Sequence, residues 1–270
     1  MTGAARNPSL AIGVAVVAAI VVAAAIGPFM VHANPIAIDL ANSLAGPSRA
    51  HPFGCDSLGR DVLARVLWGA RLSLAVSISV VALSLIAGSL IGGAAALAGG
   101  RIDDVAMRAV DIVLAFPGIL LAIALAAILG PGMIDLVIAL AAMGWTGYAR
   151  IVRGEILSLR EREYVVAARA LGASQSRLLF RHLLPGIAGP VAVNATFGIG
   201  GIIGAEAALS FLGLGAMPPT PSWGNMLDAG RAFLLVAPHL TTAPGVAIGV
   251  AILGFNLLGD GIAQFIGYRA

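Results

Sequence analysis

Residues 150–190 read RIVRGEILSLREREYVVAARALGASQSRLLFRHLLPGIAGP, the longest polar passage in a chain that is otherwise mostly apolar. Seven arginines lie in this passage, against three acidic residues, Glu155, Glu161 and Glu163. Arginine-rich segments between hydrophobic ones are typical of the cytoplasmic loops of membrane proteins. We therefore expect residues 150–185 to form a cytoplasmic loop.

Inside this loop the pattern is helix, break, helix. Four residues at spacing i, i+3, i+4 and i+7 share one face of the first helix: Tyr164, Ala167, Ala168 and Leu171. Gly172 is expected to end that helix, and Ser174 to cap a second helix that continues to Pro185. Two short helices at an angle would fit a groove on another protein. The same pattern also describes an amphipathic hairpin lying on the membrane surface.

The composition indicates an integral membrane protein. The chain has 270 residues, 59% of them hydrophobic and 11% charged, and its mean hydropathy is +0.98. The formal charge of +3 comes from arginines that flank apolar segments without interleaved aromatic residues. Such arginines orient a membrane protein, so we expect membrane lipid as a partner and no nucleic acid.

Missing residue types exclude several kinds of chemistry. All sixteen basic residues are arginine, so the chain has no P-loop GxxxxGK[ST] motif and no Schiff-base lysine. Cys55 is the only cysteine, and the four histidines lack metal-ligand spacing, so we expect no disulfide and no metal site. An intramembrane hydrolase is disfavoured because G-x-S-x-G is absent and no histidine lies deep in a span. We expect no enzyme activity and no cofactor in this chain.

Hydropathy predicts six membrane spans. They are Leu10–Val31, Leu72–Leu97, Val110–Leu129, Met133–Tyr148, Gly186–Leu212 and Leu240–Ile266. The third is interrupted by Pro117-Gly118 and preceded by a cytoplasmic turn at 101–108. We divide the chain into an N-terminal transmembrane helix (1–32), an external loop with an amphipathic helix (33–71) and a membrane core (72–270) that contains the 150–185 loop. Val31-His32-Ala33 also resembles a signal-peptidase site, so a cleaved signal peptide is the alternative to a retained first helix.

Arginine positions predict the orientation. Six spans place both termini and the 150–185 loop on one side of the membrane. That side would hold Arg6, Arg101, Arg108, Arg150, Arg153, Arg160, Arg162, Arg169, Arg177, Arg181 and Arg269. The other side would hold Arg49, Arg60, Arg65, Arg71 and Arg231. The outer cluster before the second span is an imperfection of the pattern. The bias predicts cytoplasmic termini.

The 150–185 loop resembles the "EAA" loop of ABC importer permeases, a pattern of EAA, three residues, Gly, nine residues and I-x-L-P. The residues in register are Ala167, Ala168, Gly172, Leu184 and Pro185. Val166 stands in the place of the glutamate and His182 in the place of the isoleucine, which leaves open whether Glu163, one turn earlier, replaces the glutamate. The sequences EYVVAARALGAS and RHLLP are similar to those of the dipeptide, oligopeptide and nickel permease family.

A second stretch, HPFGCDSLGRDVLARVLWGARLSL at 51–74, resembles the signature of the C-type partner in peptide permease pairs. The matching residues are Asp56, Gly59, Arg60, Asp61 and Arg65. Cys55 stands where the pattern has threonine. Leu58, Val62, Arg65 and Val66 recur at helical spacing, so we expect an amphipathic helix that leads into the second span and supports the structure more than it contacts substrate. PSWGNML, at 221–227, is also similar to this family.

The resemblance implies an all-α, six-span type I ABC importer permease in the bacterial inner membrane, for di- or oligopeptides or alternatively nickel chelates. It implies a homologous second permease, two cytoplasmic ATPases that hold ATP and Mg, and an external substrate-binding protein or lipoprotein. Residues expected to dock on an ATPase are Glu163, Tyr164, Ala167, Ala168, Leu171, Gly172, Ala173, Ser174, Arg181, His182 and Pro185.

Polar residues within the spans are candidates for the pathway or its gate. Glu206 follows a glycine-rich run, and we expect it either to pair structurally at a helix junction or to face the pathway near an outer gate. Asn194 and Asn256 should face the bundle and bond between helices. Asp111 could pair with Arg108, one turn earlier. Intramembrane carboxylates also keep open an ion-coupled carrier, although no inverted repeat is evident.

Overall fold

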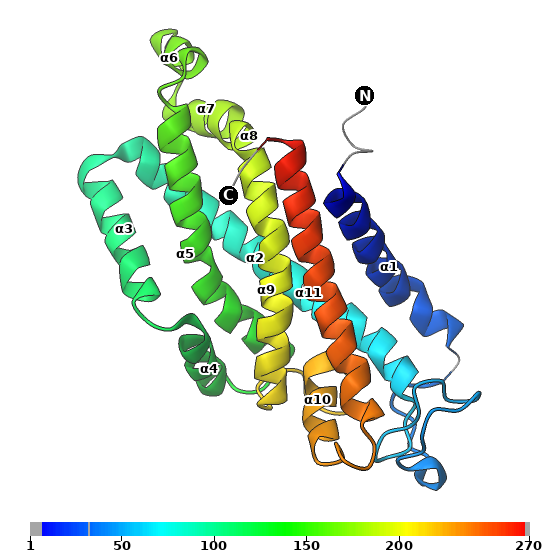
Figure 1. Ribbon diagram of the computed structural model, residues 1–270. Helices are drawn as coiled ribbons and strands as arrows, with labels where there is room; N and C mark the ends of the chain where they lie inside the picture. Colours follow the sequence, from blue (N-terminus) through cyan, green and yellow to red (C-terminus); the bar gives the residue numbers. More distant parts are fainter. Residues whose placement is uncertain (1–6, 32, 268–270) are drawn as a thin grey trace.

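The computed structural model describes residues 7–31 and 33–267, and these residues fold into a helical bundle (Figure 1). Arg6, His32 and Arg269 lie outside them. The α-helices are α1 (Pro8–Met30), α2 (Val62–Ala98), α3 (Gly100–Leu114), α4 (Gly118–Leu129), α5 (Met133–Leu159), α6 (Glu163–Ala170), α7 (Gln175–Leu178), α8 (Leu184–Gly186), α9 (Ala188–Phe211), α10 (Trp223–Arg231) and α11 (His239–Phe265). A 3-10 turn covers Leu40–Asn42 and a π-helix covers Leu179–Leu183. In the described ranges, β-pairing is limited to an isolated bridge between Cys55 and Asp61.

Among the described residues, five helices are long and apolar enough to cross a membrane, namely α1, α2, α5, α9 and α11. Helices α3 and α4 pass the same test together but meet at an angle of 84°, so the count is six if this bent pair is one span. The break lies at the expected Pro117-Gly118. The expected turn at 101–108 is wrong, because α3 is already helical from Gly100. With α3 and α4 counted as one bent span, the all-α six-span fold is confirmed.

Two helices are longer than the sequence indicated. Helix α2 has 37 residues and joins the amphipathic segment to the second span, so the division at residue 71 falls inside one helix. Asp61 caps its N-terminus by accepting a hydrogen bond from the Ala64 N–H at 2.7 Å. Helix α5 continues to Leu159, because Val152 and Ile156 are fully buried and keep the arginine-rich segment packed as a helix. The loop therefore begins at Arg160.

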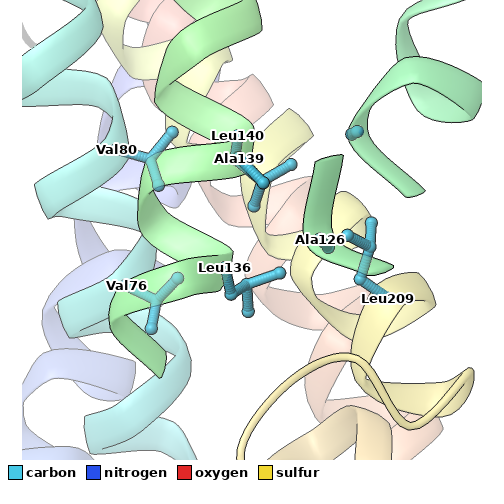
Figure 2. Packing of buried hydrophobic residues seen from close by; sticks show 8 residues of the cluster. Val76, Val80, Ala126, Leu136, Ala139, Leu140 and Leu209 are labelled. Carbon is cyan, nitrogen blue, oxygen red and sulfur yellow. The ribbon is translucent and has the colours of Figure 1, made fainter. Parts of the chain in front are cut away.

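The close pair at the centre of the bundle is α2 and α5. A Cβ on Gly88 would meet the carbonyl oxygen of Trp145 at 2.6 Å, so only glycine allows this approach. Apolar residues from four helices fill the space next to this pair (Figure 2). They are Val76 and Val80 of α2, Leu136, Ala139 and Leu140 of α5, Ala122 and Ala126 of α4 and Leu209 of α9; all except Ala122 are labelled in the figure.

Arg71 of α2 fastens α1 to the bundle. Pro28 lies inside α1 and has no N–H, so the carbonyl of Ala24, four residues earlier, loses its helical donor. The Arg71 Nε donates to that carbonyl at 2.5 Å, and its Nη2 donates to the carbonyl of Ala25 at 2.6 Å. The guanidinium also lies 4.8 Å from the ring centre of Phe29. This arginine of the outer cluster thus completes the hydrogen bonding of a proline-interrupted helix.

Replacing Arg71 with methionine is expected to lower the free energy of unfolding by about 2 kcal/mol, because two backbone carbonyls lose a charged donor. Thermal unfolding of the purified protein in detergent measures the effect. Arg71→Lys is the matched control, and it should lose less because an ammonium group can reach one carbonyl. Equal melting temperatures for wild type and Arg71→Met would contradict this role.

Candidate functional site

The expected corner between two short helices is present. Helix α6 ends in a Schellman motif, in which the Ala173 N–H donates to the Ala168 carbonyl at 3.1 Å and the Gly172 N–H to the Arg169 carbonyl at 3.0 Å. Gly172 has a φ of +82°, a left-handed conformation that favours glycine. The Ser174 hydroxyl accepts from the Arg177 N–H at 3.4 Å and caps α7. The two local predictions about Gly172 and Ser174 are confirmed.

An apolar cluster anchors this corner to the bundle. We call it the corner cluster, and its buried members are Ala96, Val152, Ile156, Val165, Leu178, Leu179, Leu183 and Ile187. These residues come from α2, α5, the corner and the turn before α9. Because such packing is dense, a force on the corner is transmitted to the spans on which it rests. The Arg160 Nη1 adds a hydrogen bond of 3.2 Å to the Ala96 carbonyl.

The side of the corner that faces away from the bundle is exposed. Helix α6 projects beyond the rest of the bundle (Figure 1). Leu171 is 88% exposed, and Tyr164 and Val166 are about half exposed. The other predicted docking residues are exposed (Glu163, Ala167, Gly172, Ser174, Arg181 and Pro185) or half-buried (Ala168, Ala173 and His182). The predicted docking residues up to Ser174 thus lie on α6 and in the turn that follows it, whereas Arg181, His182 and Pro185 lie in the segment between α7 and α9. Val165 is the buried residue of α6.

Two ion pairs below the corner connect α3 to α5. Arg153 binds Asp103 with two hydrogen bonds, of 2.5 and 2.6 Å. Arg150 binds Asp111 at 2.5 Å. The predicted partner of Asp111 was Arg108, so that expectation is wrong. Pairing between helices has no fixed sequence spacing, and the available signal was only that opposite charges occur on consecutive helices.

Glu206 lies at a junction of helices. Its side chain is fully buried. The Ser73 hydroxyl of α2 donates to its Oε2 at 2.8 Å, and the Ser210 hydroxyl of α9 donates to its Oε1 at 2.7 Å. The Ser77 hydroxyl donates to the Ser73 carbonyl at 2.7 Å. Both carboxylate oxygens therefore accept a hydrogen bond, which offsets the free-energy cost of burying this polar group.

The two candidate asparagines are half-buried, Asn194 in α9 and Asn256 in α11. The Asn194 amide donates to the Pro190 carbonyl of its own helix at 2.9 Å. This bond differs from the expected one between helices, because the side chain of an asparagine in a helix can reach the carbonyl four residues earlier.

The signature residues at 56–65 hold the segment before α2 together. The Asp56 carboxylate accepts from the Arg60 Nε at 2.7 Å and lies 3.5 Å from the Arg65 Nε. Gly59 has a φ of +74°, and any Cβ there would collide with the Asp39 backbone. The Arg65 Nη1 donates to the Pro35 carbonyl at 2.9 Å. Signature residues thus position backbone rather than present free charges.

The PSWGNML stretch forms the start of α10. Ser222 and Asn225 make a reciprocal capping box, with hydrogen bonds of 3.0 and 3.2 Å between each side chain and the other residue's N–H. The Trp223 indole donates to the Val66 carbonyl at 3.0 Å and so connects α10 to α2. Gly224 allows α10 to approach Ser210, the residue that donates to Glu206.

Residues 84–270 match the family described as "Binding-protein-dependent transport system inner membrane component". The chain belongs to this family. It is therefore a multi-pass permease component of ABC importers, a class that works with ATPase and substrate-binding partners. No enzyme function is indicated for it.

Similar proteins include the dipeptide transport system permease protein DppC of Alkalihalophilus pseudofirmus, 42% identical over 95% of this chain and 84% of that protein. The glutathione transport system permease protein GsiD of Pectobacterium atrosepticum is 46% identical over 80% of this chain and 72% of that protein. A chain of the MetNI methionine ABC transporter in an inward-facing conformation aligns with a TM-score of 0.62 at 17% identity, over 74% of this chain and 95% of that chain. This likeness shows the type I importer fold.

Proposed function

We propose that this permease belongs to an ATP-driven importer of di- or oligopeptides and is its C-type subunit. Two relatives with peptide-type names, a dipeptide and a glutathione permease, support the substrate class. The proposed assembly contains a homologous second permease, two cytoplasmic ATPases and an external substrate-binding protein or lipoprotein. ATP and Mg would be held by the ATPases, and both termini of this chain would lie in the cytoplasm.

The corner between α6 and α7 carries this proposal. Its exposed apolar surface, with Leu171 88% exposed, is suited to a groove on an ATPase subunit. Its base is continuous with the corner cluster, which includes residues of α2 and α5. Nucleotide-driven movement of an ATPase would therefore move these helices and switch the pathway between outward- and inward-facing states.

In the same proposal Glu206 is a structural junction near the outer side rather than a contact for cargo. Its full burial and its two serine donors support this role. Asn194 and Asn256 remain candidates for pathway lining, because they are half-buried in the chain alone and neighbouring subunits would decide what they face.

Affinity purification of the tagged chain from membranes tests the proposal. We expect a second permease and two ATPases to copurify, and proteoliposomes of this complex with the binding protein should import labelled dipeptide in an ATP-dependent, vanadate-sensitive manner. Uptake driven by an ion gradient alone, without ATP, would contradict the importer and support a secondary carrier. Vanadate-sensitive uptake of a nickel chelate but not of peptide would change the substrate only.

A further inference from the structure

Helix α3 divides its free surface into two stripes. Asp103 and Val110 are buried where α3 packs in the chain. The charged stripe consists of exposed residues at i, i+3, i+7 and i+10: Arg101, Asp104, Arg108 and Asp111. The apolar stripe has the same spacing one residue later and is also exposed: Ile102, Val105, Ala109 and Ile112. The two stripes lie side by side on the free face, about 100° apart around the helix axis, and both point away from the packed face.

These stripes follow the long direction of the bundle. Helix α3 lies alongside α5 and does not lie across the end of the bundle (Figure 1). Ten residues of helix from Arg101 to Asp111 cover about 15 Å, whereas the headgroup layer on one side of a bilayer is only about 5–8 Å thick. The apolar stripe suits lipid. The deep end of the charged stripe would be costly in lipid and requires water or protein beside it.

An open ion pair stands at that deep end. Asp111 is bound to Arg150 of α5, and the two side chains are 64% and 57% exposed. By contrast, the side chains of the Asp103–Arg153 pair are only 13% and 30% exposed. Gly147 and Gly154 lie on either side of Arg150 along α5, and the space where each would carry a Cβ is open. The Asp111–Arg150 pair therefore lies on the surface of this chain rather than in its packed interior.

We propose that the charged stripe and Arg150 line the cytoplasmic half of the translocation path and receive a solute that carries both charges. Signs alternate along this surface, from Arg101 to Asp104, Arg108, Asp111 and Arg150. Each charged end of a zwitterion meets a residue of opposite charge at successive positions along the surface. Because the two signs alternate, no position binds the solute too tightly to release it. This inference rests on the proposed function, since a peptide with free termini is such a solute.

Cysteine labelling of the assembled transporter tests the path. The native thiol gives little background, because Cys55 is buried and burial, together with Asp61, Asp56 and Asp39, raises the pKa of its thiol. Cysteines are introduced at Arg108 on the charged stripe, at Ala109 on the apolar stripe as the matched control, and at Gly147. A membrane-impermeant maleimide is added to inside-out vesicles. We expect Arg108→Cys to react at least about tenfold faster than Ala109→Cys, because only a hydrated thiol ionises and reacts.

Trapping with ATP and vanadate should slow the labelling of Gly147→Cys, because alternating access closes the cytoplasmic side. Millimolar alanylalanine should also slow it, and the same peptide with an acetylated N-terminus and amidated C-terminus should not.

Equal labelling rates at Arg108→Cys and Ala109→Cys would overturn the proposal that the charged stripe lines the path. So would protection of all three positions in every state, which would assign the surface to the contact with the second permease. Equal effects of the two peptides on labelling would overturn the proposal that the path receives a solute carrying both charges. Absence of peptide uptake with intact, state-dependent labelling would contradict the proposed function and leave the path in place.

Discussion

Gly172→Arg is expected to abolish transport while the protein still inserts in the membrane. Gly172 has a φ of +82°, where a side chain costs about 1–2 kcal/mol. Space around its Cβ position is open, so the first carbon of the new side chain meets no other atom of the chain. The new side chain would instead project from the corner that we propose to dock on an ATPase. The variant should therefore fold but fail to engage its partner.

Three measurements on the same preparation check this result. Uptake of labelled dipeptide should be lost, the amount of protein in the membrane fraction should stay near that of wild type, and ATP hydrolysis should no longer respond to substrate. Gly172→Asn is the matched control, because asparagine tolerates the left-handed conformation and is smaller. It should keep most of the uptake. Normal uptake by Gly172→Arg would refute the docking role.

The corner was predictable because its determinants are local. Gly172 and Ser174 act within one turn of helix, through a left-handed backbone and a side-chain cap. The spans were predictable for a similar reason, since hydropathy over about 20 residues reports what a bilayer accepts. Both features depend on residues close together in the sequence, so they can be predicted without knowing which helices pack against each other.

The end of α5 was missed because tertiary packing decides it. Arg150 and Arg153 gave this segment the composition of a loop. In the structure Val152 and Ile156 are fully buried, and the two arginines face Asp111 and Asp103 of α3. A segment with a buried face and paired charges remains helical whatever its average polarity. The same partnership explains why Asp111 does not pair with Arg108.

The outer arginines show why the charge rule looked imperfect. Arg60 is bound to Asp56, and Arg71 donates to two carbonyls of α1. These residues were counted as topology signals on the unfavourable side. Their hydrogen bonds give them a structural role that no count of charges in the sequence reveals. The structural interpretation of this segment came instead from the helical spacing of its residues 58, 62, 65 and 66.

Glu206→Leu is expected to destabilise the protein by about 3 kcal/mol, because the hydroxyls of Ser73 and Ser210 lose a buried acceptor. The melting temperature in detergent and the yield of the copurified complex should both fall. Removing the hydroxyls as well, in the triple variant with Ser73→Ala and Ser210→Ala, should recover part of the stability. A buried donor is costly only while it is unpaired.

Glu206→Gln separates the structural role from contact with cargo. The amide has the same shape, its oxygen can accept from one serine, and its NH2 can donate to the hydroxyl oxygen of the other. If the carboxyl group only joins α2 to α9, the variant should assemble and keep most of the ATP-dependent uptake. If the pathway needs its charge, uptake should be lost while the complex still copurifies in normal amount. Full burial of Glu206 between its serine donors favours the first result, so loss of uptake without loss of assembly would overturn the structural assignment.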